Sequence, residues 1–226
     1  MRPTLLAVAL AATCHAFAAG PEPVVQDTIP FDGGRYVVAR SAELACVIAL
    51  QGGISHAATL TFDAAIARAD RGGCAKPWLL LESPGGFLAD GIELGRAVRL
   101  AGMRTITRYD CSSACALIFL GGVERVMVGS RARIGLHQAG RTYRDDKYCS
   151  STRQTTAARD IRRYLAWVVP ATAETVFDTL MRTECTAIEF VQGQHALDLG
   201  IATSLDRPDE DLFGPRQRRT EKAKRD

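Results

Sequence analysis

The chain has 226 residues, of which 47% are hydrophobic and 23% charged, with a formal net charge of +3 at pH 7. This composition excludes a wholly disordered chain, a collagen and a coiled coil, and the length suits one globular domain. The small net charge gives no reason to expect a nucleic-acid partner.

The first 19 residues are typical of a secretory signal peptide. Arg2 precedes an apolar run over residues 5–19, and small residues stand just before Gly20. The run is shorter than the ~20 residues that span a bilayer, so a membrane anchor is the less favoured reading. No later stretch is long and apolar enough to cross a membrane. We therefore expect cleavage of residues 1–19, export to a bacterial periplasm, and a mature chain with no transmembrane segment.

Residues 20–32 are predicted to be an extended leader, and residues 33–205 a single domain. Within the domain, apolar and β-branched runs predict strands, and apolar residues at helical spacing predict helices. The predicted strands cover residues 35–40, 45–51, 78–81, 103–109, 125–128 and 133–137. The predicted helices cover residues 56–70, 89–101, 112–120, 157–169, 172–182 and 190–199. Because strands and helices alternate from residue 45 onward, we expect an α/β domain with a largely parallel sheet.

The C-terminal residues differ in character from the domain. Residues 206–211 are acidic, and residues 215–226 hold six Lys and Arg against two Asp and Glu. With almost no apolar residues, segment 206–226 is predicted to be a disordered charged tail. The overall +3 therefore combines a basic tail with a slightly acidic domain.

Loss of the signal peptide would leave six cysteines in the mature chain. An even number in an oxidising compartment favours disulfides, although six cysteines allow 15 pairings. The spacings contain no paired C-x-x-C and no nearby histidine cluster, so no metal or other cofactor is expected. The disulfide candidates are Cys46, Cys74, Cys111, Cys115, Cys149 and Cys185.

Three motifs between residues 79 and 138 carry chemistry: Ser-Pro-Gly-Gly at 83–86, Cys-Ser-Ser-Ala-Cys at 111–115 and Gly-Leu-His-Gln at 135–138. Paired glycines let a backbone amide face a pocket, and a serine at a helix start lies where a developing anion is stabilised. A serine hydroxyl needs a base such as histidine to become a nucleophile. Each motif alone has a simpler reading: a turn, a pair of N-cap serines, and a structural histidine. Their order on strand–turn–helix elements is more specific than any one of them.

With these motifs the sequence resembles the proteolytic subunit of the Clp protease, within the wider crotonase-like superfamily. The resemblance rests on residues 81–91, 112–116 and 132–138 and continues weakly through 190–201. It implies a ClpP/crotonase-like fold of repeated β-β-α units in a single domain. It also implies roles: Ser113 as nucleophile, His137 as general base, and the amides of Gly86 and Ala114 as the oxyanion hole.

The sequence departs from the family pattern at the catalytic acid and around Ser113. The family's catalytic aspartate would fall at Ile188, with Glu189 beside it and Glu184 one turn away. Either Glu189 substitutes for that acid, the Ser–His pair works without a carboxylate, or the site is inactive. In addition, Cys111 and Cys115 bracket Ser113, and we hypothesise that a disulfide between them rigidifies the start of the nucleophile helix.

The leading interpretation is an exported serine hydrolase, an endopeptidase acting on peptides or proteins. The alternative is a catalytically inactive periplasmic protein that keeps the fold for binding or assembly. An acyl-CoA enzyme of the crotonase group fits export poorly, since CoA substrates are cytosolic. A Ser–Lys enzyme like signal peptide peptidase A would need Lys76 or Lys147, and neither lies in a matching motif. A homo-oligomer is favoured, and no ATPase partner is expected outside the cytoplasm.

Overall fold

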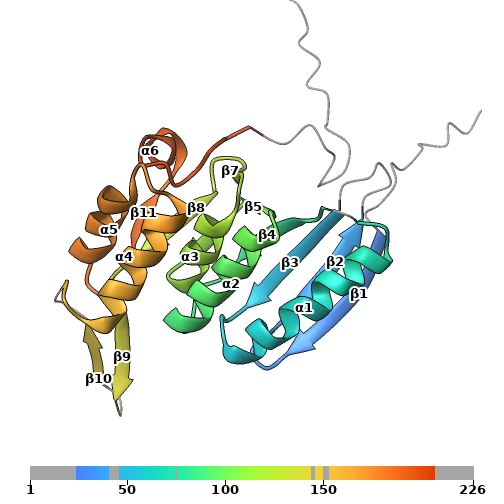
Figure 1. Ribbon diagram of the computed structural model, residues 1–226, viewed down its shortest axis with the longest axis horizontal. Helices are drawn as coiled ribbons and strands as arrows, with labels where there is room; N and C mark the ends of the chain where they lie inside the picture. Colours follow the sequence, from blue (N-terminus) through green and yellow to red (C-terminus); the bar gives the residue numbers. More distant parts are fainter. Residues whose placement is uncertain (1–23, 41–45, 75, 144–145, 150–152, 207–226) are drawn as a thin grey trace, which may run out of the picture.

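A six-stranded sheet forms the centre of the protein in a computed structural model that describes residues 24–40, 46–74, 76–143, 146–149 and 153–206 (Figure 1). The strand order is β1-β2-β3-β4-β5-β7. The first three strands are joined antiparallel, and β3, β4, β5 and β7 run parallel. The strands are β1 (Val24–Phe31), β2 (Gly34–Arg40), β3 (Cys46–Gly52), β4 (Trp78–Glu82), β5 (Arg104–Thr107) and β7 (Arg125–Met127).

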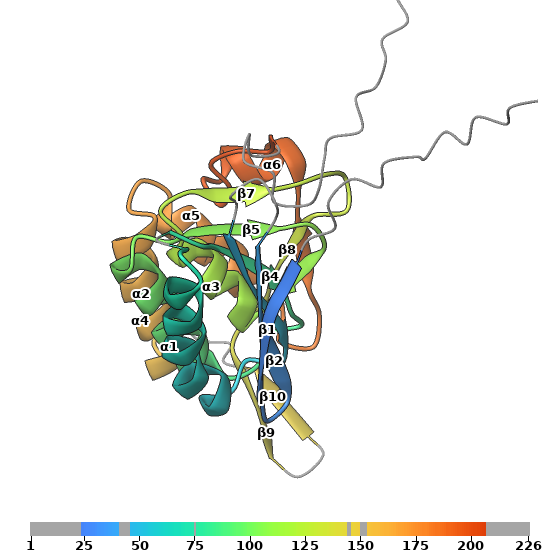
Figure 2. The same ribbon diagram turned by 90° about the vertical axis from the view of Figure 1, so that its right-hand side faces the viewer.

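A three-stranded sheet, β11-β8-β6, carries two of the chemical motifs. Its strands are β6 (Asp110–Ser112), β8 (Arg133–Leu136) and β11 (Glu189–Val191). The strand β6 runs parallel to β8, whereas β11 runs antiparallel to it. A separate hairpin of β9 (Gly140–Tyr143) and β10 (Asp146–Cys149) follows β8 and extends away from the body of the molecule (Figures 1 and 2).

The helices α1, α2 and α4 lie on one side of the large sheet (Figure 2). The helices are α1 (His56–Arg71), α2 (Leu88–Leu100), α3 (Ala114–Gly121), α4 (Thr156–Val168), α5 (Ala173–Arg182) and α6 (Gly193–Asp198). Every residue of α3 is buried, as its continuous apolar sequence predicts. The helix α2 packs so closely on α3 that a Cβ atom at Gly91 would lie 2.8 Å from the carbonyl oxygen of Ala114. The motif at 111–115 therefore leads into a helix that is buried in the core.

Arg125 of β7 forms hydrogen bonds with the segment that follows α6, at residues 200–201. Its guanidinium donates hydrogen bonds to the carbonyl oxygens of Ile201 (2.8 Å), Gly122 (3.1 Å) and Gly200 (3.0 Å). Burial, more than the neighbouring charge of Arg99, lowers the pKa of Arg125 to about 10. The residue thus remains charged at neutral pH, and backbone carbonyls compensate for its desolvation.

The structure confirms the mixed α/β fold, the strand–helix alternation and a parallel sheet centre, and it corrects two predicted segments. Residues 190–199 are not one helix: β11 ends at Val191, and α6 begins only at Gly193, whose φ of 54° is outside the helical range for an ordinary residue. Part of the predicted leader, Val24–Phe31, is the edge strand β1.

The predicted signal peptide and, beyond Asp206, the predicted tail lie outside the described residues. None of the helices in the described part of the chain combines the length and the apolar character needed to span a bilayer.

Candidate active site

The three motifs predicted from the sequence meet in space. The loop at 83–86 follows β4, and its first residue is joined to β6 in both directions: the amide of Ser83 donates to Asp110 and its carbonyl accepts from Ser112. The amide of Ser113 in turn donates to the carbonyl oxygen of Gly135 in β8, at 2.8 Å. These backbone bonds bring the paired glycines, the two serines and the histidine strand to one place.

A cavity of about 650 Å³ opens where the motifs meet. All four residues that the resemblance assigns to catalysis and the oxyanion hole line it: Gly86, Ser113, Ala114 and His137. Much of the remaining wall is apolar, formed by Phe87, Leu88, Leu117, Leu136, Ile161, Leu180 and Ile188. The cavity is thus a mainly apolar hollow with a few convergent polar groups, which is the usual character of a small-molecule or peptide site.

Ser113 has an unusual backbone conformation at the start of α3. Its φ of 58° and ψ of −124° make it, glycines aside, the one residue with positive φ in the described part of the chain. Such a conformation costs about 1–3 kcal/mol and persists only where the surroundings enforce it. Although Ser113 occupies the N-cap position, its hydroxyl makes no cap hydrogen bond. Ser113 is therefore the N-cap residue of α3 by position, but its side chain does not cap the helix.

Two backbone amides near Ser113 have no backbone acceptor among the described residues. Ile54 forms backbone hydrogen bonds with both neighbours of Gly86. Its amide donates to the carbonyl of Gly85 (2.8 Å), and its carbonyl accepts from the amide of Phe87 (2.9 Å). Within the described residues, neither the amide of Gly86 nor that of Ala114, in the first turn of α3, donates a backbone hydrogen bond. A Cβ atom at Gly86 would lie 2.0 Å from the carbonyl oxygen of Ile54, so this approach requires glycine.

His137 follows β8, and its ring is oriented by the next residue. The ring Nδ1 lies 2.7 Å from the carbonyl oxygen of Gln138. A carbonyl only accepts, so Nδ1 carries the hydrogen in this contact, and in the neutral ring Nε2 is then the nitrogen with the lone pair. Two hydrogen bonds hold Gln138 and so position this carbonyl. The backbone amide of Gln138 donates to the carbonyl of Thr183 (2.8 Å), and its side-chain Nε2 donates to the carbonyl of Met181 (2.7 Å). Sequence reasoning missed this contact, since nothing in the residue types predicts a main-chain acceptor.

Glu189, the sequence candidate for the third catalytic residue, lies in β11 opposite Leu136. Its carboxylate accepts hydrogen bonds from the guanidinium of Arg182 and from the hydroxyl of Thr183 at 2.9 Å. Hydrogen bonding from Arg182 is the main cause that holds the pKa of Glu189 below its usual value. Glu189 is not among the residues that line the cavity with Ser113 and His137.

We expect Glu189→Gln to lower the free energy of unfolding by about 1 kcal/mol at pH 7 and by nearly nothing near pH 3. The folded protein lowers the pKa of Glu189, so its carboxylate stabilises the fold above the unfolded-state pKa. That contribution is lost as the pH falls through the folded-state pKa. Urea unfolding of both proteins across this pH range measures the difference. A constant gap at all pH values would contradict an ion pair as its source.

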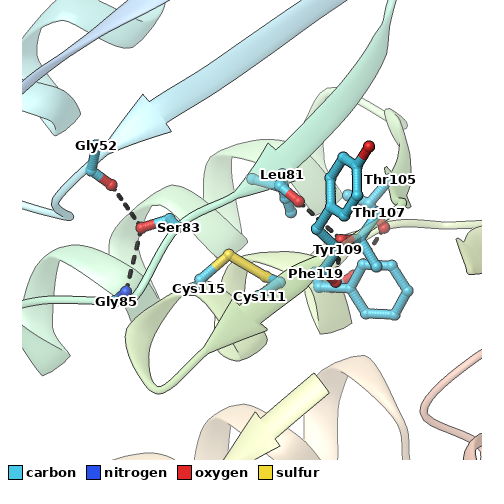
Figure 3. Close-up of a disulfide and its surroundings, with 10 residues drawn as sticks. All are labelled: Gly52, Leu81, Ser83, Gly85, Thr105, Thr107, Tyr109, Cys111, Cys115 and Phe119. Carbon is cyan, nitrogen blue, oxygen red and sulfur yellow. Dashed lines mark hydrogen bonds between the residues drawn. A yellow bond between two sulfur atoms is a disulfide. The ribbon is translucent and has the colours of Figure 1, made fainter. Parts of the chain in front are cut away.

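The six cysteines of the domain form three disulfides: Cys46–Cys74, Cys111–Cys115 and Cys149–Cys185. The second joins Cys111, the middle residue of β6, to Cys115 in the first turn of α3, and both cysteines are fully buried (Figure 3). The predicted disulfide around Ser113 is thus confirmed. Three disulfides in one domain are typical of proteins that fold in an oxidising compartment.

Buried hydroxyls join the elements around this bridge (Figure 3). Ser83 donates to the carbonyl of Gly52 (2.6 Å) and accepts from the amide of Gly85 (3.1 Å), which fixes the glycine loop on β3. Thr107 donates to the carbonyl of Leu81 (2.8 Å), which joins β5 to β4. Buried hydrogen bonds therefore hold the glycine loop against β3 and join β5 to β4 close to the disulfide.

The alternative Ser–Lys arrangement receives no support from Lys76. This residue is exposed before β4 and does not line the cavity. The side chain of Lys147 lies outside the described part of the structure.

Comparison with known proteins agrees with the fold described above. No protein-family model and no curated protein matches this sequence. A mutant of ClpP1 from Listeria monocytogenes is similar in structure, with a TM-score of 0.54 and 13% identity over 72% of this chain and 92% of that chain. A mutant of the membrane-bound stomatin-specific protease 1510-N has a TM-score of 0.55 and 15% identity over 74% of this chain and 80% of that chain. Such low identity shows the fold alone, and this protein has a ClpP-like fold.

Proposed function

We propose that the protein is an exported serine hydrolase that cleaves peptide bonds, with Ser113 as nucleophile and His137 as general base. The observation that carries the proposal is a serine in a strained backbone conformation, in one cavity with a histidine and two amides for which the described part of the chain offers no backbone acceptor. Strained conformations at such positions are typical of functional sites.

The chemistry follows from these groups. The Ser113 hydroxyl transfers its proton to Nε2 of His137 as its oxygen bonds to the substrate carbonyl carbon. The carbonyl oxygen becomes an oxyanion, which accepts hydrogen bonds from the amides of Gly86 and Ala114, each worth about 3 kcal/mol in the transition state. The C–N bond then breaks as His137 returns the proton to the leaving amine. Water attacks the acyl-enzyme by the same route in reverse, and this releases the acid.

The third partner of the pair is proposed to be the carbonyl of Gln138 instead of a carboxylate. It selects the same tautomer of His137 that an aspartate would select, and its dipole stabilises the imidazolium. It supplies no full negative charge, so we expect a slower enzyme than one with an acid in that place. Glu189 remains the competing candidate, and the labelling rate of a Glu189→Gln variant separates the two.

Export is part of the proposal, with residues 1–19 as the cleaved signal and the periplasm as the compartment. The three disulfides support it, since such bonds are rare in reducing cytoplasm. Intact mass measurement of the protein isolated from the periplasmic fraction tests the cleavage site.

The experiment that tests catalysis is covalent labelling with a fluorophosphonate. We expect the folded protein to be labelled, with digestion and mass spectrometry placing the label on Ser113 and not on the adjacent Ser112. Ser113→Ala should abolish labelling while retaining the circular dichroism and thermal midpoint of the parent. Heat-denatured protein serves as the control for non-specific reaction. Well-folded protein that takes no label would overturn the proposal and favour a catalytically inactive binding protein.

A further inference from the structure

A second cavity, of about 760 Å³, adjoins the candidate active site. The two cavities share Pro84 and Ile188 in their walls. Ser112 lines the second cavity and Ser113 the first, although the two residues are adjacent in the chain. Since an extended peptide advances about 3.3–3.6 Å per residue, a peptide at Ser113 enters the second cavity within a few residues.

The ionised groups in and beside this cavity are paired, with one exception. Arg133 holds Asp110 through two hydrogen bonds of 2.8 and 2.7 Å. Arg108, next to the cavity, likewise binds the carboxylate of Glu82 at 3.2 and 3.3 Å. Both acidic groups of the wall are thereby neutralised.

The exception is Arg131, which has no carboxylate within ion-pair distance among the described residues. Its guanidinium lies over the ring of Tyr109, 4.6 Å from the centroid, and donates to the Tyr109 hydroxyl at 3.1 Å. Stacking restricts the long side chain and leaves other N–H donors of the planar fork for a ligand. The cavity therefore holds one oriented positive charge that no carboxylate of the described residues neutralises.

Apolar surface beside Arg131 suits a peptide chain. Phe190 and Ile188 line the same cavity and are 37% and 46% exposed, large fractions for such side chains. Ser130 and Gln192 add neutral hydrogen-bonding groups. A ligand that fits this lining has an extended backbone, some apolar surface and one carboxylate.

We propose that the second cavity is a substrate subsite in which Arg131 binds a peptide carboxylate, either an acidic side chain or the C-terminal group. The inference rests on the proposed peptidase function, and it names the substrate class of that site. The favoured substrates are peptides with a carboxylate a few residues from the bond placed at Ser113. Arg131 acts in binding and takes no part in the proton transfers.

The test measures binding without catalysis, in the full mature chain carrying Ser113→Ala. The probes are fluorescein-labelled eight-residue peptides with capped ends, in matched series that carry Asp, Asn or Lys at each position in turn. We expect Asp to bind roughly tenfold more tightly than Asn at one or two neighbouring positions, and Lys more weakly than either. A further series with a free C-terminus shows whether the terminal carboxylate replaces the side chain.

Arg131→Gln should remove the preference for Asp over Asn, and Arg131→Lys should keep only part of it, because an ammonium lacks the planar fork. The matched control is Arg96→Gln, since Arg96 also lies over an aromatic ring, that of Trp167 at 5.7 Å, and lines neither cavity. It should leave the preference unchanged.

Equal affinity for Asp and Asn peptides, or a preference that survives in Arg131→Gln, would overturn the subsite. Failure of the peptidase proposal has a different signature. In that case the Asp preference is present in Ser113→Ala, while the parent protein neither cleaves the peptides nor reacts with a fluorophosphonate.

Discussion

Replacing His137 with alanine is expected to slow fluorophosphonate labelling of Ser113 by about 10²- to 10⁴-fold, the usual contribution of a general base. A neutral serine hydroxyl is a weak nucleophile, and the ring Nε2 is the base proposed to remove its proton. Residual labelling should persist, because the amides of Gly86 and Ala114 still stabilise the oxyanion. Second-order labelling rates at constant pH measure the effect.

Two further histidines provide matched controls. His56 and His195 are both exposed, and neither lines the cavity. Their alanine variants should label at the rate of the parent protein. A comparable loss in these variants would show that the effect of His137→Ala is not specific to the site.

Glu189→Gln separates the two candidates for the third partner. Where a carboxylate orients the histidine of a triad, its amide variant lowers the rate by about 10⁴-fold. If the carbonyl of Gln138 orients His137, Glu189→Gln should change the labelling rate by less than about threefold while lowering stability by the ion-pair contribution of about 1 kcal/mol. A rate loss of several orders of magnitude would restore Glu189 as the catalytic acid and contradict the carbonyl.

The motifs and most of the elements follow from local sequence. The buried helix α3 and the strand β4 are continuous apolar runs, so the burial of both could be predicted from their sequences. The meeting of the three motifs was predictable from their order on alternating strands and helices. The conformation of Ser113 was not, because positive φ is enforced by tertiary neighbours and not by the serine itself.

The errors have equally local causes. Residues 190–199 contain apolar residues at helical spacing, but pairing of Glu189–Val191 with β8 outweighs that pattern, and Gly193 separates the strand from α6. The hairpin β9–β10 lies in a polar segment that lacks strand alternation, so sequence reasoning assigned it no element. The disulfide partners of Cys46 and Cys149 lie 28 and 36 residues away, and spacing does not specify such long-range pairs.

Removal of the Cys111–Cys115 bridge is expected to affect activity far more than stability. The bridge closes a loop across four positions, whereas Cys46–Cys74 closes one across 28. Chain-entropy arguments then give a stability contribution of about 2 kcal/mol for the short loop and about 3.5 kcal/mol for the long one. All four cysteines are buried, so the loss of packing in alanine variants is similar.

Activity should rank the two double variants in the opposite order. Without the Cys111–Cys115 bridge, Ser113 can relax from its positive φ, whose cost of about 1–3 kcal/mol corresponds to roughly a 5- to 160-fold change in rate. Cys111→Ala/Cys115→Ala should therefore label more slowly than the parent by roughly 5- to 160-fold. Cys46→Ala/Cys74→Ala should label at the parental rate at temperatures where it remains folded. Urea unfolding and labelling rates on the same samples supply both measurements.

The opposite rankings make the test decisive, because a bridge that acted only through overall stability would impair labelling most in the less stable variant. Loss of labelling in proportion to the loss of unfolding free energy would contradict the proposed role of the bridge. If Cys111→Ala/Cys115→Ala loses less stability but labels more slowly than Cys46→Ala/Cys74→Ala, the Cys111–Cys115 disulfide serves chiefly to hold Ser113 in a conformation that serine avoids. Such a support needs an oxidising compartment, so the same result would tie the geometry of the site to export of the protein.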